Sequence, residues 1–175
     1  MQELSLHLLD IAINSLDAGA TKVKIDVRMD DDSIQITVAD NGCGMSDGVL
    51  KRCTDKGYST KGSKGMGLAL LNEECTACGG HMKVSSTLGK GTEVLATFDR
   101  RNNRCKPLGN MGATIVPLLD ERADIFLRVE ICNKTFSFDT QSLKERGLSL
   151  ADASTMAAVK KNINEEIYKI GGAKL

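Results

Sequence analysis

Four short segments that combine polar residues with glycines constrain this sequence most, because each lies where a predicted helix or strand begins or ends. Each segment alone carries little weight, since glycines are common in turns. All four in one order, between residues 10 and 92, rarely coincide by chance, so they predict a single pocket built from several element ends. The segments are residues 10–20 (DIAINSLDAGA), 40–45 (DNGCGM), 65–70 (GMGLAL) and 91–92 (GT).

Around these segments the hydrophobic pattern predicts an α/β sandwich. Apolar residues recur at helical spacing from Leu4 to Leu16, and Gly19 is placed to end that helix. Alternating strands bury one side only, which predicts a mixed, mostly antiparallel sheet over about residues 22–98 with helices on one face. The covering helices are expected at residues 4–17, 46–53 (with Ser46 as N-cap) and 66–77, and residues 54–64 have the composition of a loop.

The C-terminal part of the chain is expected to form a small α+β appendage. A polar connector at residues 100–104 separates it from the rest, so we divide the chain into residues 1–100 and 105–175. The appendage has two interpretations: a unit that docks a partner, or a structural extension that covers an edge or face of the sheet. Its predicted elements are a helix at 111–119, a hairpin at 125–138 that turns at Asn133, and a helix at 150–170.

Charge and hydropathy argue against several classes of protein. Basic and acidic residues balance at 23 each, and no basic block stands out beyond Lys160 and Lys161, which argues against a nucleic-acid partner. No apolar run approaches the ~18 residues that a membrane span needs. The N-terminus has no basic-then-apolar segment of the kind that directs secretion, so a cytoplasmic location is expected.

The six cysteines are expected to be reduced thiols in that compartment. Cys75 and Cys78 have the spacing of two metal ligands or a redox pair, but they lie late in a predicted helix and no second pair at metal spacing follows. We favour structural thiols and keep metal or redox chemistry as the alternative. His7 and His81 lack the setting of a phosphoacceptor and are expected to be ordinary packed or surface histidines.

The first predicted helix carries a polar stripe in which Asp10, Asn14 and Asp17 stand without a nearby cation. A solvated face is the simpler interpretation, although such faces usually carry Lys and Glu. Asp10 and Asn14 are four residues apart, so their oxygens point into one small volume. That arrangement suits a hard divalent cation, which takes oxygen ligands and usually keeps waters and substrate phosphates.

Asp40 and the glycines after it also have two interpretations. They favour a turn, because Asp and Asn bond their own backbone and Gly accepts a positive φ. Alternatively, the carboxylate of Asp40 accepts a hydrogen bond from an adenine amino group, and Gly42 and Gly44 clear room for the base. Gly65 and Gly67 open a helix after a Lys-rich loop, which suits the binding of phosphate.

Together the four segments resemble the N box and the three glycine boxes of the GHKL superfamily, the ATPases of gyrase, the chaperone, histidine kinases and MutL. The resemblance covers about residues 4–98 and implies a Bergerat-type α/β sandwich that binds ATP and Mg²⁺. Its first half, residues 14–20 and 40–44, is closest in sequence to MutL. Its second half, residues 65–70, 79–80 and 91–92, is closer to histidine kinases and anti-sigma-factor kinases.

The resemblance also implies roles for individual residues. Asn14 corresponds to the magnesium ligand, Asp40 to the adenine-binding carboxylate, and Thr92 to a residue that helps to hold the base through a water. Asp10 stands where hydrolytic members place a water-activating glutamate, and its side chain is one methylene shorter. Residues 62–67 correspond to the hinge of a phosphate-binding lid. The expected cofactor-binding set is Asn14, Asp17, Asp40, Gly42, Gly44, Met45, Lys61, Gly62, Lys64, Gly65, Met66, Gly67, Leu68 and Thr92, with Asp10 as the catalytic residue.

Several functions are compatible with this resemblance. The leading one is an ATPase or nucleotide-dependent switch that acts on a partner protein, and the alternatives are an anti-sigma-type protein serine kinase and a non-enzymatic ATP-binding adaptor. Ser63 and Lys64 replace the usual Gly-Thr, so phosphate contacts are expected to differ in detail.

The tail adds a looser resemblance of its own. Residues 108–114 (LGNMGAT) and 136–140 (FSFDT) are similar to the tail of small proteins encoded near iron-only hydrogenases. This similarity implies a hydrogenase-related partner or a regulator, and a homodimer is a further option.

Overall fold

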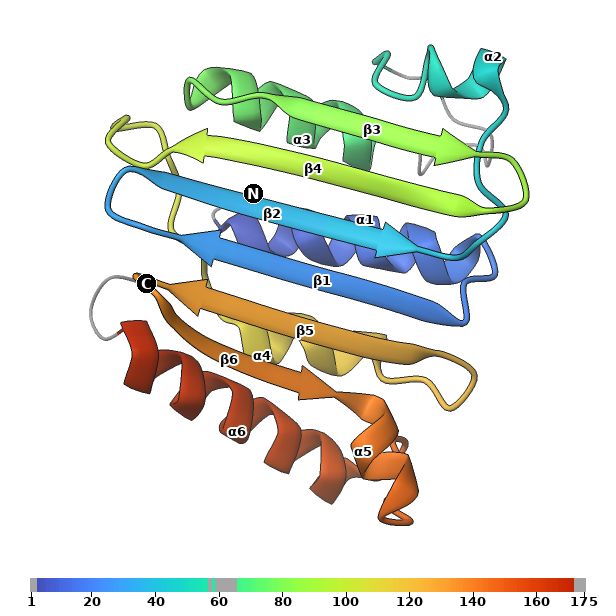
Figure 1. Cartoon of the computed structure of the whole chain (residues 1–175), viewed down its shortest axis with the longest axis vertical. Helices are drawn as coiled ribbons and strands as arrows, with labels where there is room; N and C mark the ends of the chain where they lie inside the picture. Colours follow the sequence, from blue (N-terminus) through green and yellow to red (C-terminus); the bar gives the residue numbers. More distant parts are fainter. Residues whose placement is uncertain (1–2, 57, 59–65, 172–175) are drawn as a thin grey trace.

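The protein is described by a computed structural model that covers residues 3–56, 58 and 66–171. The strands form one mixed sheet in the order β3-β4-β2-β1-β5-β6 (Figure 1). Neighbouring strands are antiparallel except β1 and β5, which run parallel, so the predicted mostly antiparallel sheet is confirmed. The strands are β1 (Lys22–Met29), β2 (Ser33–Asp40), β3 (Met82–Thr87), β4 (Gly91–Asp99), β5 (Asp124–Ile131) and β6 (Lys134–Asp139).

Helices cover one face of this sheet, and Figure 1 looks onto the other face, with the strands in front of α1, α3 and α4. The uncovered face carries partly exposed ion pairs, such as Arg28–Asp26 at 3.2 Å and Arg128–Glu130 at 2.9 Å. No helix in the described ranges combines the length and the apolar composition needed to cross a bilayer. The helices are α1 (Leu4–Asp17), α2 (Asp47–Leu50), α3 (Gly67–Ala77), α4 (Met111–Ile115), the 3-10 turn η1 (Val116–Leu118), α5 (Thr140–Glu145) and α6 (Ala153–Gly171).

The C-terminal part of the chain extends the sheet, which corrects the prediction that the sheet ends near residue 98. β5 pairs with β1 along its whole length, from Asp124 opposite Lys22 to Ile131 opposite Met29. The inward side chains of β5, including Leu127, are fully buried in the same core as α1. The tail therefore covers an edge of the sheet, as its structural interpretation expects. This pairing protects backbone groups of β1 that would otherwise be unpaired.

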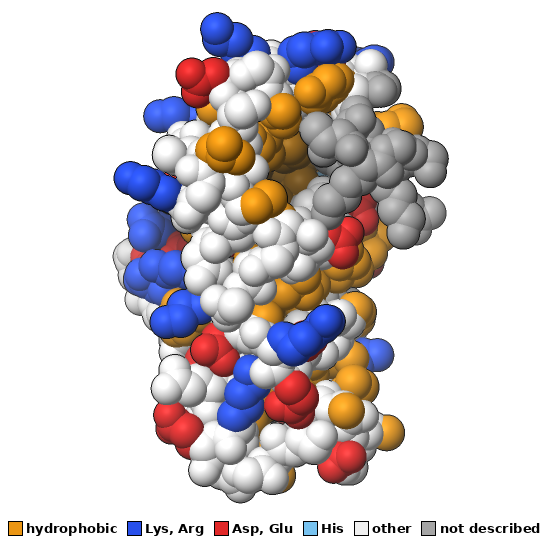
Figure 2. All heavy atoms as spheres, turned by 90° about the vertical axis from the view of Figure 1, so that its right-hand side faces the viewer, with side chains coloured by type: hydrophobic (Ala, Val, Ile, Leu, Met, Phe, Trp, Pro, Cys, Tyr) orange, Lys and Arg blue, Asp and Glu red, His pale blue; other side chains and the backbone are white. Residues whose placement is uncertain are grey.

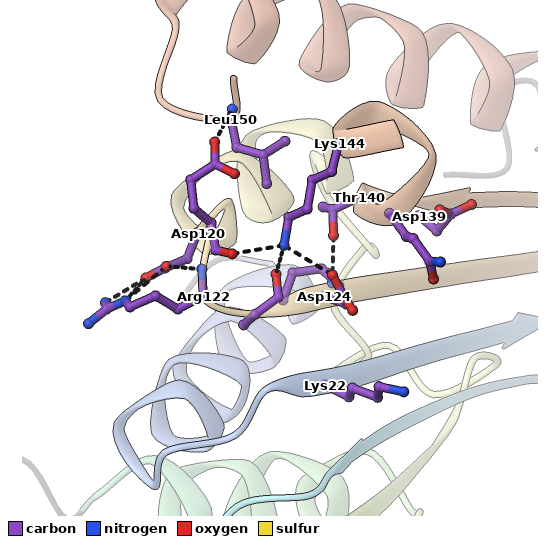
Figure 3. Close-up of polar contacts among 12 residues, drawn as sticks. Lys22, Asp120, Arg122, Asp124, Asp139, Thr140, Lys144 and Leu150 are labelled. Atoms are coloured by element: carbon purple, nitrogen blue, oxygen red, sulfur yellow. Dashed lines mark hydrogen bonds and ion pairs between the residues drawn. The ribbon is translucent and has the colours of Figure 1, made fainter. Parts of the chain in front are cut away.

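Contacts within the tail hold α5 against the start of β5 (Figure 3). The Lys144 ammonium of α5 donates to the carbonyl oxygen of Glu121 at 3.1 Å and to the carboxylate of Asp124 at 3.0 Å. The hydroxyl of Thr140 accepts the backbone N–H of Ile125 at 2.9 Å. Because α5 satisfies polar groups of the loop before β5, it fixes where this strand enters the sheet.

Two helices differ from the prediction in extent. The helix expected at 46–53 is limited to Asp47–Leu50, has no buried residue, and lies beside β3 instead of on the sheet face, since it lacks an apolar stripe. The helix expected at 111–119 is α4 followed by η1, because Pro117 has no N–H to continue an α-helix. Helix α5 was not predicted at all.

Candidate functional site

A cleft of about 480 Å³ opens where α1 and β2 both end, beside the β3–β4 turn. Figure 2 looks onto this end of the molecule and shows hydrophobic side chains inside a hollow in its upper half. The volume is in the range of small-molecule sites. The lining residues are Ile11, Asn14, Ser15, Asp17, Ala18, Asp40, Cys43, Gly44, Met45, Ser46, Val49, Cys53, Tyr58, Gly67, Leu68, Leu88, Thr92 and Val94.

The C-terminus of α1 stops at the cleft because Gly19 ends the helix as predicted. Gly19 has φ +77°, a conformation that costs glycine little. Its N–H donates to Leu16 O at 3.0 Å, and the N–H of Ala20 donates to Ser15 O at 3.1 Å. This is a Schellman motif, which satisfies the last carbonyls of the helix. The last turn of α1 therefore presents polar side chains, Asn14 among them, to the cleft.

The carboxylate of Asp40 is held by three donors from three segments. Its Oδ2 accepts the Ser15 hydroxyl at 2.7 Å, and its Oδ1 accepts the N–H groups of Gly42 at 2.8 Å and Thr92 at 3.2 Å. The bond to Gly42 is the turn that the sequence suggests. However, a carboxylate has about four acceptor positions, and Asp40 also lines the cleft. About one acceptor position is therefore left for a ligand.

Two glycines allow these segments to cross at close range. At Gly44, with φ +63°, a Cβ atom would lie 2.1 Å from the carbonyl oxygen of Thr87. At Gly91, with φ +116°, a Cβ atom would lie 1.9 Å from the carbonyl oxygen of Asp40. Both contacts are with backbone, which cannot move aside cheaply. Glycine is therefore required where the loop after β2 meets the β3–β4 turn.

Two serines that the sequence analysis missed complete this network. They are Ser15 of α1 and Ser86 of β3. The Ser86 hydroxyl lies 2.8 Å from Met45 N and 2.9 Å from both Gly91 O and Thr92 Oγ1. Ser15 could have been found as the neighbour of Asn14. Ser86 lies opposite Thr92 in the pairing of β3 with β4, and only that register identifies it.

The structure brings together most of the expected site residues that it describes. Gly42 bonds Asp40 without lining the cleft, and Asp10 and Met66 do not line it either. A Cβ atom on Gly67 would lie 3.6 Å from Asp10 Cβ and 3.5 Å from Asn14 Nδ2, so both residues face the start of α3. Lys61, Gly62, Lys64 and Gly65 lie outside the described residues. The expected residues that do line the cleft are Asn14, Asp17, Asp40, Gly44, Met45, Gly67, Leu68 and Thr92.

The cysteine pair and the two histidines lie away from this lining. Burial raises the pKa of Cys75 to about 12 and that of Cys78 to about 11, so both thiols stay protonated at neutral pH. Protonated thiols are poor ligands and nucleophiles, which favours the structural interpretation. The described part of the chain contains no group of three or more His, Cys, Asp or Glu side chains that could hold a metal ion. His7 is buried in α1, and the ring of exposed His81 contacts the Thr97 hydroxyl at 2.9 Å.

Comparisons with known proteins agree with this geometry. The family described as histidine kinase-, DNA gyrase B-, and HSP90-like ATPase matches residues 1–102. A protein described as a sensor protein, from Shewanella frigidimarina, is 32% identical over 103 residues, which are 55% of this chain and 16% of that protein. The sensor protein kinase GraS of Staphylococcus aureus is 31% identical over 86 residues, 46% of this chain and 25% of the kinase. The chain thus spans a quarter or less of these relatives.

Among solved structures, the N-terminal domain of a DNA repair protein has the same fold. The match has a TM-score of 0.53 at 17% identity and covers 78% of this chain and 52% of that chain. At this identity the likeness concerns the fold alone. It confirms the predicted α/β sandwich.

Proposed function

Because the chain belongs to the histidine kinase-, DNA gyrase B- and HSP90-like ATPase family, we propose that it binds ATP together with Mg²⁺ in the cleft at the end of α1. In this proposal Asp40 and Thr92 hold the adenine base. Asn14 contributes its amide oxygen to the cation, and Asp17 also lines the cleft. The proposal gives the four sequence segments one common role.

The observation that carries the proposal is the remaining acceptor position of Asp40. Three protein donors orient this carboxylate, and it lies in a cleft with apolar walls such as Ile11 and Val94. A flat apolar base fits such walls, and its amino group supplies the missing donor. A hydrogen bond to a charged acceptor contributes about 1.5–3 kcal/mol. An oriented carboxylate with one open acceptor is therefore an adenine-reading group.

The cation and the phosphates fit the same cleft. Mg²⁺ is usually bound through one or two protein oxygens and keeps waters and substrate phosphates as its other ligands. Asn14 alone is therefore sufficient as a protein ligand. When bound, Mg²⁺ neutralises phosphate charge. Asp10 lies one helical turn from Asn14 and beside Gly67, and we propose that it holds the water that attacks the terminal phosphate.

For the whole protein we propose a nucleotide-dependent ATPase or switch that acts on a partner protein. The similarity to sensor kinases supports histidine-kinase-type nucleotide binding in the matched region only, because the chain spans a small part of each relative. An anti-sigma-type serine kinase and a non-enzymatic adaptor remain the alternatives. Incubation with ATP labelled at the γ-phosphate, with and without copurifying proteins, separates the three. Free phosphate indicates an ATPase, labelled protein indicates a kinase, and neither indicates an adaptor.

Titration calorimetry with ATP and Mg²⁺ tests the binding site. Asp40→Asn is expected to weaken binding by about 1–3 kcal/mol, because the amide loses the charge or turns an NH₂ toward the base. Glu93→Gln, an exposed carboxylate one residue from Thr92, is the matched control and is expected to bind normally. Unchanged affinity in Asp40→Asn would contradict the adenine assignment.

A further inference from the structure

The hydroxyl of Ser86 has three polar neighbours and only one hydrogen to share among them. Met45 N–H can only donate to it, and the carbonyl of Gly91 can only accept from it. The third neighbour, Thr92 Oγ1 at 2.9 Å, can do either. A hydroxyl has one donor and two acceptor positions. All three contacts are satisfied only when Ser86 donates to Gly91 and Thr92 donates to Ser86.

The opposite assignment leaves two acceptors facing each other. If Ser86 gave its hydrogen to Thr92, its contact with Gly91 O at 2.9 Å would contain no hydrogen. That arrangement would place two oxygen lone pairs at hydrogen-bond distance, which is repulsive. The fully satisfied assignment therefore determines the direction of the Thr92 hydroxyl.

This direction decides what Thr92 presents to the cleft. With its hydrogen committed to Ser86, Thr92 Oγ1 has only acceptor positions left, and Thr92 lines the cleft together with Asp40. The backbone N–H of Thr92 is already directed at Asp40 Oδ1. Thus the Asp40 carboxylate and the Thr92 hydroxyl oxygen both act as acceptors at this edge of the cleft. An edge made of acceptors matches a base that offers hydrogen-bond donors and repels a base that offers a carbonyl oxygen there.

We propose that Ser86 is a positioning residue that holds the Thr92 hydroxyl as an acceptor and so makes the cleft prefer purine nucleotides with a 6-amino group over those with a 6-oxo group. Ser86 does not line the cleft, so it acts through Thr92 and not by touching the base. The inference rests on the proposed function and adds to it the residue that sets base specificity.

The test is calorimetry with two nucleotides, ATP and inosine triphosphate, each with Mg²⁺. The two share the ribose and the phosphates, so a general loss of binding cancels in the ratio of their affinities. In Ser86→Ala the Thr92 hydroxyl regains the freedom to donate into the cleft. We expect the ATP preference to fall by about threefold to tenfold, the range of one hydrogen bond.

Three further variants separate positioning from structural support. Ser85→Ala removes a hydroxyl from the adjacent, exposed position of β3 and should keep the wild-type ratio. Ser86→Thr keeps the hydroxyl and should restore the preference. In a Thr92→Val background the preference is already reduced, and adding Ser86→Ala should reduce it no further, because the two residues act as one unit.

The outcomes distinguish this inference from the proposed function. If Ser86→Ala weakens both nucleotides equally, Ser86 only supports the loop at Met45, and the inference is overturned while ATP binding stands. If the wild-type protein binds both nucleotides equally, the acceptor edge does not select the base, and the inference is again overturned. If the wild type binds neither, the proposed function fails and the inference with it.

Discussion

The two ends of helix α1 differ in how their polar groups are satisfied. At the cleft end the Ser15 hydroxyl bonds Asp40 at 2.7 Å, within a network that reaches Ser86. At the other end His7 is 3% exposed, and neither ring nitrogen has a hydrogen-bond partner within the described structure. The first N–H groups of α1 are instead satisfied by the tail, since Leu4 N and Ser5 N donate to the carbonyls of residues 107 and 108 at 3.0 and 2.8 Å.

One polar stripe on a helix can thus serve two purposes. His7, Asp10 and Asn14 follow each other at helical spacing, but the first lies in the core and the last lies at a cleft. The cleft end is specified by the glycine segments, and the buried end depends on the tail. Variants near the cleft should therefore impair nucleotide binding or turnover, and variants near the buried end should change stability.

The largest effect is expected from removing the tail. A chain that ends at Arg104 loses the carbonyls that cap α1 and the four fully buried inward residues of β5. Burial of one such side chain is worth about 1.5–3 kcal/mol, so the four together contribute about 6–12 kcal/mol, which is comparable to the whole stability of a typical domain. We expect the truncated chain to precipitate or to lack a cooperative thermal transition in circular dichroism. A folded, ATP-binding truncation would instead show that residues 1–100 are an independent domain and would leave the tail free to dock a partner.

The next largest effect is expected at Asp10, which lies between the two ends of α1. If the protein hydrolyses ATP, Asp10→Asn should lower turnover by about 10²–10⁴-fold while nucleotide affinity stays nearly unchanged, because a general base acts in the transition state. Phosphate release and calorimetry measure the two quantities separately. Asp26→Asn, on the uncovered sheet face, is the control for a lost carboxylate. Equal hydrolysis by wild type and Asp10→Asn would give Asp10 a structural role.

A third prediction concerns the crossing of backbone at the cleft. Gly91→Ala should destabilise the protein by about 3 kcal/mol, because it combines an unfavourable positive φ with a Cβ clash against Asp40 O. Gly89→Ala is the matched control, since Gly89 also has a positive φ, +78°, but open space around it. Its cost should be about 1–2 kcal/mol. Urea unfolding of both variants measures the difference, and equal costs would mean that the close approach is not required.

The smallest effect is expected at the buried end. Burial lowers the pKa of His7, with a smaller lowering from Lys106 and opposing contributions from Glu74 and Asp10. The unfolded chain therefore binds a proton near pH 6.5 that the folded chain takes up only at lower pH. Stability from this group is complete above pH 6.5 and is lost as the pH falls from there through the folded pKa.

His7→Leu removes this pH dependence and also a buried ring that has no hydrogen-bond partner among the described residues. We expect it to raise the free energy of unfolding at pH 7.5 by about 1 kcal/mol and to flatten the loss of stability between pH 6.5 and 5. Urea unfolding at several pH values measures both. His81→Gln, at an exposed histidine, should leave the slope as in the wild type. A slope that is unchanged in His7→Leu would assign the acid sensitivity to other groups.

Much of the N-terminal region could be predicted from the sequence, because its signals are local. The spacing of apolar residues gave α1 its observed bounds, and Gly19 was identified as its end. The segment around Asp40 was placed correctly at the end of a strand. The length of helix α2 was overestimated, because a short polar segment carries little periodicity.

The relations between segments far apart in the chain, in contrast, are visible only in the folded structure. The sequence alone was enough to identify the long helices, the alternating strands and the glycines that permit tight turns, since these depend on periods of 3.6 and 2 residues and on local backbone geometry. It did not determine that β5 pairs in parallel with β1, or that Ser86 lies opposite Thr92, because strand partners are chosen by burial and by shared backbone hydrogen bonds. The first pairing joins the tail to the core, and the second places Ser86 where it directs the Thr92 hydroxyl.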